Sequence, residues 1–120
     1  MKLPGPDHPI TLTPAALRWQ ATFRGRVIAD STSAIVLREA SYPQVIYFPK
    51  ADVAMEHLAS TSRSTHCPYK GDASYFSISL SGETAENAVW AYETPYPAMA
   101  EIAGRVAFYP NIVQIAEVGA

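Results

Sequence analysis

The chain has 120 residues, of which 48% are hydrophobic and 17% charged, and its formal net charge is −2. This length predicts one domain. A chain of this size buries roughly two-thirds of its unfolded surface, enough for a hydrophobic core without a metal or disulfides. The slightly acidic balance lacks the basic excess that nucleic acids and anionic membranes attract, so we expect neither as a partner.

Cys67 is the only cysteine, so an intramolecular disulfide is excluded and a reducing compartment is favoured. The first residues lack the apolar segment of a secretory signal peptide. The longest apolar stretch, residues 106–116, contains polar residues and is shorter than the roughly 20 residues of a membrane-spanning helix. These features predict a cytoplasmic protein.

The N-terminal segment is rich in proline. Four of the ten prolines lie within the first fourteen residues. Proline fixes φ and has no N–H to donate to a β-ladder, so we expect an extended arm over residues 1–13, lying on the protein's own surface or on a partner's. Residues 14–120 then form a single β-rich domain.

Short β-type segments separated by turn residues follow the arm. They span residues 19–23, 26–29, 34–39, 44–48, 55–58, 74–80, 83–92, 106–109 and 112–118. Residues 49–53 predict a single helical turn, and Pro97 and Gly104 bound one short helix near 97–103. This spacing predicts a mainly β protein, α+β at the margin: a compact small β-barrel, a tent-like fold or a sandwich of antiparallel hairpins.

The turn at Ser81-Gly82 predicts a hairpin that pairs Leu80 with Glu83 and Phe76 with Asn87. Alternation then gives one apolar core face and one mixed face of aromatic, hydroxyl and carboxylate side chains. The mixed face comprises Tyr75, Ser77, Ser79, Thr84, Glu86, Ala88, Trp90 and Tyr92. It is either a solvated outer face with aromatic cross-strand pairs or the floor of a pocket.

Residues 63–72, just before this hairpin, predict a loop with several reactive side chains. We expect a small-molecule site, for an anionic or nucleotide-like ligand, between this loop and the mixed face. Arg63 and Lys70 would neutralise an anionic group, although Lys70 also fits a solvated turn. Tyr75 and Trp90 would stack on a planar part of the ligand. The further candidates are Cys67, Tyr69 and Tyr92 as ligand-binding residues, and His66 and Glu86 as catalytic proton carriers.

Two other chemistries receive less support. A Cys67 nucleophile needs an imidazole within hydrogen-bond reach, but the adjacent His66 would point away, so His8 or His57 would have to serve. A small buried side chain is the alternative for Cys67. One cysteine and three histidines show no zinc-ligand spacing, and no phosphate-binding glycine motif is present. We therefore predict neither a metal nor a cofactor.

Several segments resemble the bacterial and fungal family known as domain of unknown function 427. They are residues 4–9, 25–31, 47–49, 65–75, 85–92 and 102–109. The resemblance implies a compact, mostly β single domain without an established activity. The family also carries a nucleotidyltransferase-like label, but such enzymes hold Mg²⁺ with paired aspartates, and Asp72 has no partner in its segment.

Two hypotheses of function follow. The first is the small-molecule-binding domain described above, with catalysis at residues 63–72 left open. The alternative is a non-catalytic interaction or homo-oligomerisation module, in which the aromatic face and the proline-rich arm meet another chain.

Overall fold

The computed structural model describes residues 1–119, in which ten β-strands form three antiparallel sheets. The strands are β1 (Ile10–Pro14), β2 (Arg18–Phe23), β3 (Arg26–Ser31), β4 (Ile35–Glu39), β5 (Val45–Tyr47), β6 (Leu58–Cys67), β7 (Gly71–Leu80), β8 (Glu83–Ala91), β9 (Val106–Phe108) and β10 (Gln114–Val118). The predicted mainly β fold is confirmed.

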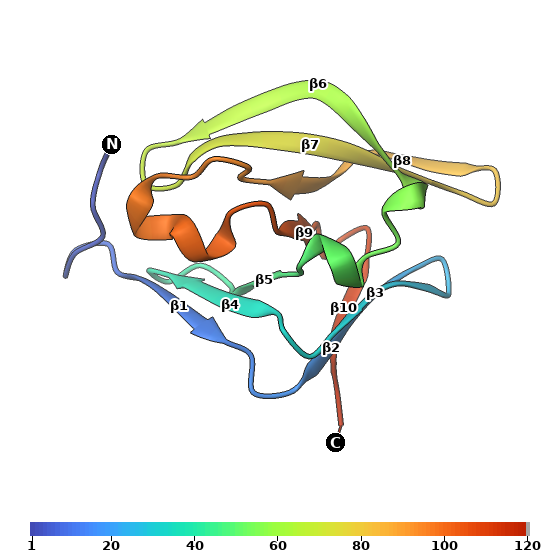
Figure 1. The fold of residues 1–120 in the computed structure, drawn as a ribbon, viewed down its shortest axis with the longest axis horizontal. Helices are drawn as coiled ribbons and strands as arrows, with labels where there is room; N and C mark the ends of the chain where they lie inside the picture. Colours follow the sequence, from blue (N-terminus) through green and yellow to red (C-terminus); the bar gives the residue numbers. More distant parts are fainter. Residues whose placement is uncertain (120) are drawn as a thin grey trace.

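The sheets are arranged as layers joined at their edges (Figure 1). The four-stranded sheet β6-β7-β8-β9 forms the upper layer in this view, and the sheet β1-β4-β5 lies below it. The third sheet, β10-β2-β3, lies at the lower right in this view and contains the last strand of the chain, β10. Phe48, just after β5, exchanges two backbone hydrogen bonds with Val106 of β9 and so links the two layers. The sheets are not closed into a barrel.

Three 3₁₀ helices occur within residues 1–119: η1 (Lys50–Asp52), η2 (Met55–His57) and η3 (Pro97–Ile102). The predicted helical turn and the predicted short helix correspond to η1 and η3. Met99 and Ile102 of η3 are buried, which holds this short helix on the sheets. The strand predicted over residues 55–58 is wrong. The His57 amide donates to the Ala54 carbonyl and closes a 3₁₀ turn there, and β6 begins at Leu58.

The N-terminal segment lies on the protein itself. The Lys2 amide donates to the Pro68 carbonyl, and the Ala40 amide donates to the Pro9 carbonyl. From Ile10 the chain continues as β1, which pairs with β4. The division into an arm of residues 1–13 and a domain of residues 14–120 stays a prediction.

Residues 63–72 do not form the predicted loop. They are the closing end of a hairpin in which β6 runs to Cys67 and β7 starts at Gly71. The Ser/Thr-rich sequence suggested a loop, but β6 is an edge strand whose exposed positions suit hydroxyl side chains. Gly71 has a φ of +109°, and a Cβ there would lie 3.6 Å from the Pro95 Cα and the Tyr96 nitrogen.

The hairpin of β7 and β8 follows the predicted register only near its turn. Leu80 pairs with Glu83 as predicted, but Phe76 pairs with Val89 and not with Asn87. Two additional residues of β8 form a bulge, where Asn87 has a φ of +53°. The Asn87 amide donates to Ser77 Oγ at 3.0 Å, and Asn87 Oδ1 accepts from Thr61 Oγ1 at 2.7 Å. Because the insertion is even, Tyr75 and Trp90 still share a face.

Both faces of this hairpin contribute to the core. Phe76, Ile78 and Val89 belong to one buried cluster, and Tyr75 and Tyr92 belong to a second. Tyr75 is 5% exposed and Tyr92 is 7% exposed, so the alternative of a solvated outer face is wrong for these two residues. The lower layer therefore covers the mixed face at Tyr75 and Tyr92, whereas Ser79, Thr84 and Glu86, nearer the hairpin turn, are exposed.

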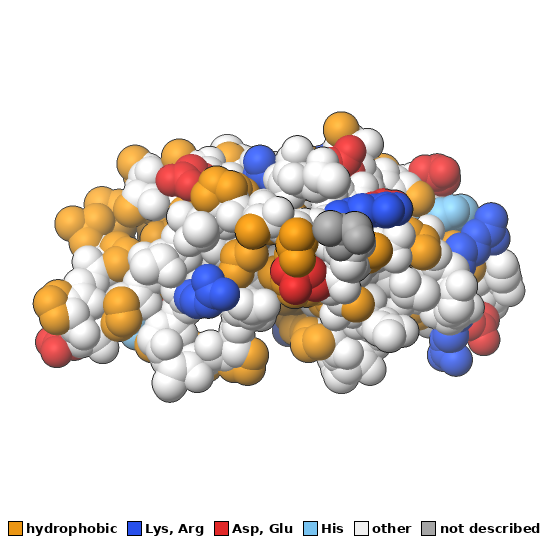
Figure 2. Space-filling model, turned by 90° about the horizontal axis from the view of Figure 1, so that it is seen from below, with side chains coloured by type: hydrophobic (Ala, Val, Ile, Leu, Met, Phe, Trp, Pro, Cys, Tyr) orange, Lys and Arg blue, Asp and Glu red, His pale blue; other side chains and the backbone are white. Residues whose placement is uncertain are grey.

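The surface shows a mixed character. On the face seen in Figure 2, acidic and basic side chains are dispersed among hydrophobic and uncharged ones. In the part of the chain that the structure describes, no helix has the length and apolar character needed to cross a membrane.

Candidate functional site

A pocket of about 180 Å³ lies between the two layers. One side comes from β4 and β5, and the other from β7, β8, the turn before β7 and the segments that follow β8 and β9. Its walls are Leu37, Glu39, Val45, Tyr47, Lys70, Tyr75, Trp90, Tyr92 and Tyr109. The pocket thus combines five aromatic side chains with one cation and one carboxylate, a composition that suits a ligand site.

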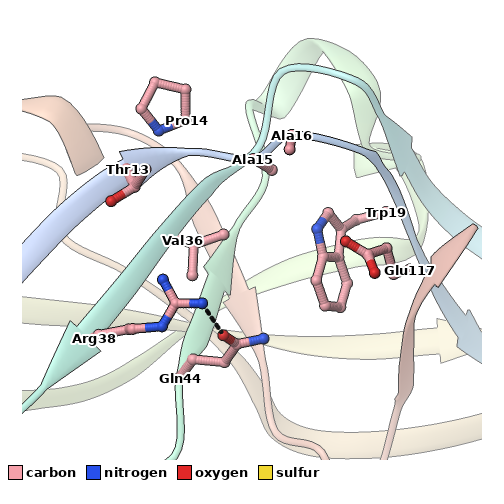
Figure 3. Close-up of a pocket in the computed structure, with 9 residues that line it drawn as sticks. All are labelled: Thr13, Pro14, Ala15, Ala16, Trp19, Val36, Arg38, Gln44 and Glu117. Carbon is pink, nitrogen blue, oxygen red and sulfur yellow. Dashed lines mark hydrogen bonds between the residues drawn. The ribbon is translucent and has the colours of Figure 1, made fainter.

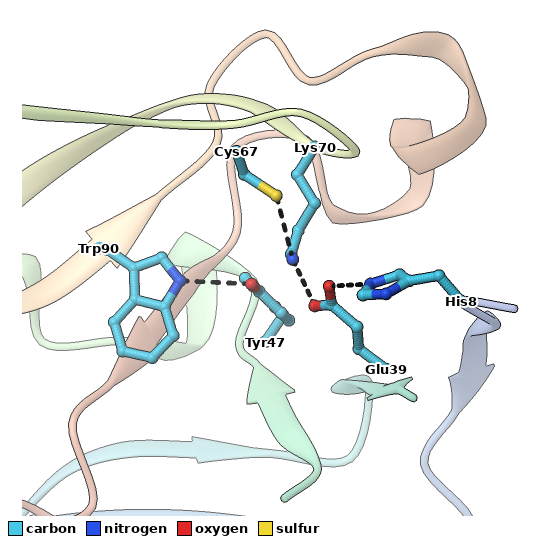
Figure 4. Close-up of polar contacts among 6 residues, drawn as sticks. All are labelled: His8, Glu39, Tyr47, Cys67, Lys70 and Trp90. Atoms are coloured by element: carbon cyan, nitrogen blue, oxygen red, sulfur yellow. Dashed lines mark hydrogen bonds and ion pairs between the residues drawn. The ribbon is translucent and has the colours of Figure 1, made fainter. Parts of the chain in front are cut away.

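Lys70 and Glu39 form an ion pair in this pocket (Figure 4). Lys70 Nζ lies 2.5 Å from Glu39 Oε1, and the side chains are 10% and 15% exposed. His8 Nε2 lies 2.7 Å from the other oxygen, Glu39 Oε2. Burial raises the pKa of Glu39, but hydrogen bonds from Lys70 and His8 outweigh burial and hold this pKa below its ordinary value of 4.5. Glu39 is therefore a carboxylate at neutral pH.

Cys67 completes the polar group at this end. Its Sγ lies 3.5 Å from Lys70 Nζ, and Figure 4 shows both side chains pointing towards Glu39. Alternation along β6 places Cys67 and Thr65 on the pocket side of the strand. The predicted site residues Cys67 and Lys70 are thus brought together by the turn at residues 68–70.

Tyr47 and Trp90 face each other across the pocket. Trp90 Nε1 donates to the Tyr47 hydroxyl at 3.3 Å, and the two rings meet edge to face at 6.4 Å between centroids. Since a hydroxyl that accepts one bond still has its own hydrogen, Tyr47 remains a donor. Burial raises the pKa of Tyr47 and also that of Tyr92, so both are neutral phenols at physiological pH.

The hydroxyls of Tyr75 and Tyr109 form a second polar group in the pocket. The Tyr75 hydroxyl is 2.9 Å from Thr65 Oγ1, and the Tyr109 hydroxyl donates to it at 3.4 Å. The Arg63 guanidinium carbon lies 4.9 Å from the centre of the Tyr75 ring. Burial raises the pKa of Tyr75, but hydrogen bonds with Thr65 and Tyr109 and the positive charge of Arg63 bring it below its ordinary value. Burial and the neighbouring Tyr75 raise the pKa of Tyr109 to about 12.

Tyr69 supports the site from outside the pocket. Its ring stacks on the imidazole of His8, with centroids 4.1 Å apart and planes 5° apart. Because His8 also contacts Glu39, the stack connects the hairpin turn and the N-terminal segment to the ion pair.

A larger and more apolar chamber of about 650 Å³ adjoins the pocket. The chamber and the pocket share Glu39, Val45 and Trp90 as walls. The remaining walls of the chamber are Trp19, Tyr42, Pro43, Gln44, Ile46, Phe108, Pro110 and Ile115. A further depression of about 340 Å³ shares Trp19 and Gln44 with the chamber, and there Arg38 donates to Gln44 at 3.0 Å (Figure 3).

The two predicted proton carriers do not line the pocket. His66 points to the other face of β6, where its Nδ1 lies 2.7 Å from Asp72 Oδ1 and its side chain is 56% exposed. Glu86 lies at another depression of about 400 Å³, which shares Tyr109 with the pocket and is also lined by Arg63. Of the predicted ligand-binding residues, Lys70, Tyr75, Trp90 and Tyr92 line the pocket.

Sequence reasoning missed Glu39, Tyr47 and Tyr109 as site residues, and it named His8 only as a partner for Cys67. Glu39 ends an apolar strand and carried no local motif. Tyr47 and Tyr109 lie in segments that resemble the family, and this resemblance was the available signal for them. The approach of Glu39 and Tyr47 to Lys70 depends on how the two layers pack, whereas Tyr109 is placed by the pairing of β9 with β8.

Within residues 1–119, no three His, Cys, Asp or Glu side chains are placed so that they could hold a metal ion together. A search of curated proteins found no match to the chain. The family model described as a domain of unknown function (DUF427) matches residues 11–119. The chain therefore belongs to the DUF427 family, as its sequence segments predicted.

Proposed function

We propose that this member of the DUF427 family binds a small molecule in the pocket around Lys70 and Glu39. The observation that carries the proposal is a well-buried ion pair surrounded by five aromatic side chains, next to an open chamber. Taking a charged pair out of water costs free energy, and this cost is offset more easily where a ligand supplies additional hydrogen bonds. Binding sites commonly combine such a polar group with aromatic walls.

The charge balance favours a neutral head group. Lys70 contributes one positive charge and Glu39 one negative charge, so an anionic ligand would have to compete with Glu39 for the ammonium group. Lys70 and Tyr47 supply donors, and Glu39 supplies acceptors. A carboxamide, or the lactam edge of a nucleobase-like heterocycle, offers one acceptor and one donor side by side and matches this arrangement.

The aromatic walls favour a planar group next to the head. The rings of Trp90 and Tyr109 lie 4.6 Å apart between centroids and are tilted by 50°. A planar ligand gains stacking contacts on such surfaces in addition to burial of apolar area.

The alternative of an interaction or oligomerisation module requires the N-terminal segment to reach another chain. In that case the contacts of Lys2 with Pro68 and of His8 with Glu39 would have to be exchanged for contacts with a partner. Light scattering of the full chain and of a chain lacking residues 1–9 compares the two hypotheses. We expect the full chain and the shortened chain both to be monomers. A dimer that forms only when residues 1–9 are present would favour the alternative.

Ligand binding is tested with benzamide and benzoate, which share a shape but differ in charge. Binding is followed through the indole N–H signal of Trp90 in two-dimensional NMR, assigned with the variant Trp90→Phe. We expect benzamide to shift this signal at lower concentration than benzoate does. The variant Lys70→Met should weaken benzamide binding at least tenfold, because it removes a donor and leaves Glu39 without its cation.

Lys50→Met is the matched control, because Lys50 forms an exposed ion pair with Glu93 at 2.7 Å and does not line the pocket. This variant should bind benzamide as the unmodified protein does. If benzoate binds more tightly than benzamide, the head group of the ligand is anionic and the proposal of a neutral head group is wrong. If neither compound shifts the Trp90 signal, the proposed function is wrong.

A further inference from the structure

The pocket around Lys70 and Glu39 is too small to enclose a typical metabolite. Its volume of about 180 Å³ lies below the roughly 300–1,000 Å³ of most ligand sites. A ligand whose head group lies there must therefore extend beyond it. The chamber that shares Glu39, Val45 and Trp90 with the pocket is the adjoining space, and at about 650 Å³ it falls within that range.

The walls of the chamber are mostly apolar and come from distant parts of the chain. Trp19 lies on β2, Ile46 on β5, Phe108 on β9 and Ile115 on β10. Since strands of all three sheets contribute, the chamber is part of the tertiary fold and not a groove along one strand. Apolar ligand surface placed here would leave water at about 25 cal/mol for each Å² that is buried.

The charge of the chamber lies where the chamber adjoins the pocket, and the uncharged polar side chains of Tyr42 and Gln44 also line it. Glu39 is the charged side chain of the chamber, and it lies on the wall shared with the pocket. Towards the outside, the chamber borders the β4–β5 connection, where Tyr42 is 65% exposed and Pro43 restricts the backbone. The Tyr42 amide donates to the Glu39 carbonyl, so this exposed turn lies next to the charged wall.

We infer that the ligand is amphipathic, with a neutral carboxamide or lactam head at Lys70 and Glu39 and an uncharged aryl or alkyl body in the chamber. This inference rests on the proposed function, because it takes the head group from it and adds the chemical class of the remainder. A polyphosphate tail does not fit this arrangement, since it would place several negative charges against apolar walls and beside Glu39.

The test is a series of 4-alkylbenzamides whose alkyl chains grow from one to six carbons, with Kd values measured by calorimetry. Each buried methylene is expected to lower Kd about fourfold until the chamber is filled. Ile115→Trp narrows the chamber and should make the gain end at a shorter chain. Ile112→Trp is the matched control, because Ile112 is exposed at the separate depression near Glu86. Thermal unfolding shows whether both variants fold.

The outcomes separate the two proposals. If benzamide binds but longer chains give no gain, the amphipathic class is wrong and the proposed head-group site stands. If plain alkylbenzenes bind as tightly as the amides do, the chamber stands and the head-group site is wrong. A gain with chain length that Ile115→Trp leaves unchanged would place the alkyl group elsewhere and overturn the inference. Failure of the whole series to bind would overturn both.

Discussion

The imidazole of His8 lies flat on the ring of Tyr69, with centroids 4.1 Å apart, while its Nε2 reaches Glu39 at 2.7 Å. One side chain of the N-terminal segment thus joins the hairpin turn to the ion pair. The N-terminal segment also contacts this turn through its backbone, because the Lys2 amide donates to the Pro68 carbonyl.

His8→Ala is expected to loosen the N-terminal segment without unfolding the domain, because the pairing of β1 with β4 does not involve His8. The Lys2 and Ala40 amides bond to carbonyls of Pro68 and Pro9, so their hydrogen exchange should become faster. Hydrogen-exchange NMR measures this effect. His57→Ala is the control and should leave both amides as they are; equal protection in His8→Ala would show that His8 does not hold the segment.

Lys70→Met is expected to destabilise the protein by about 1–3 kcal/mol, because it leaves the Glu39 carboxylate with a single partner in a mostly buried position. Urea unfolding at pH 7 measures this change. The control Lys50→Met removes one side of an exposed pair and should cost less than about 1 kcal/mol. Equal effects of the two variants would contradict a special role for the buried pair.

The contribution of Glu39 to the free energy of unfolding should depend on pH. Its folded-state pKa lies below the ordinary value of 4.5, so its contribution is complete above that pH and is lost as the pH falls through the folded-state value. In Lys70→Met the pKa is depressed less, and the loss of stability on acidification that Glu39 causes should shrink. The measurement is the free energy of unfolding between pH 7 and pH 3 for both proteins. If both proteins show the same pH dependence, Lys70 does not lower the pKa of Glu39.

Tyr75 should be the first tyrosine of the pocket to ionise. Hydrogen bonds with Thr65 and Tyr109 and the positive charge of Arg63 lower its pKa despite burial, whereas the pKa of Tyr109 rises to about 12. An alkaline titration followed by tyrosinate absorbance should lose its earliest component in Tyr75→Phe. Arg63→Met should move that component to higher pH. Arg38→Met, which removes an exposed arginine bonded to Gln44, should leave it in place.

Asn87 is suited to the bulge of β8 for two reasons, which separate variants distinguish. Asn87→Ala places a Cβ at a φ of +53° without a polar side chain and also removes the bond to Thr61, so it should cost about 1–3 kcal/mol. Asn87→Gly keeps the backbone conformation and should cost less. Thr61→Val removes the partner alone. If Asn87→Gly unfolds as readily as Asn87→Ala does in urea, backbone strain is not the reason for asparagine.

Local sequence signals predicted the strands well where turn residues bounded them. Ser81-Gly82 gave the correct pairing of Leu80 with Glu83, because a two-residue loop fixes the first pairs of a hairpin. The bulge farther along had no such signal, since asparagine occurs at many turns and surfaces. The Ser/Thr-rich segment of β6 was interpreted as a loop because its hydroxyl residues show no apolar alternation.

The candidate site was predicted in part. Tyr75, Trp90 and Tyr92 lie on or directly after the hairpin of β7 and β8, where alternation puts them on one face, and Lys70 lies in the turn just before β7. Glu39 and Tyr47 come from the lower layer, so their distance from that hairpin is set by the packing of the layers. Tyr109 follows β9 and is placed by the pairing of β9 with β8, which no local signal predicts. His66 was predicted from its neighbourhood in sequence, but adjacent residues of a strand point to opposite faces.

The bulge in β8 also constrains how this strand can change in length. Its two additional residues preserve the order of faces, so Trp90 points to the pocket and Val89 to the other core cluster. Loss of one residue between 86 and 88 would exchange the two orientations, so that the Trp90 indole points into the other core cluster and the Val89 side chain points towards the pocket. Loss of two residues would keep both where they are. We therefore expect this part of the strand to tolerate insertions and deletions of two residues better than those of one residue.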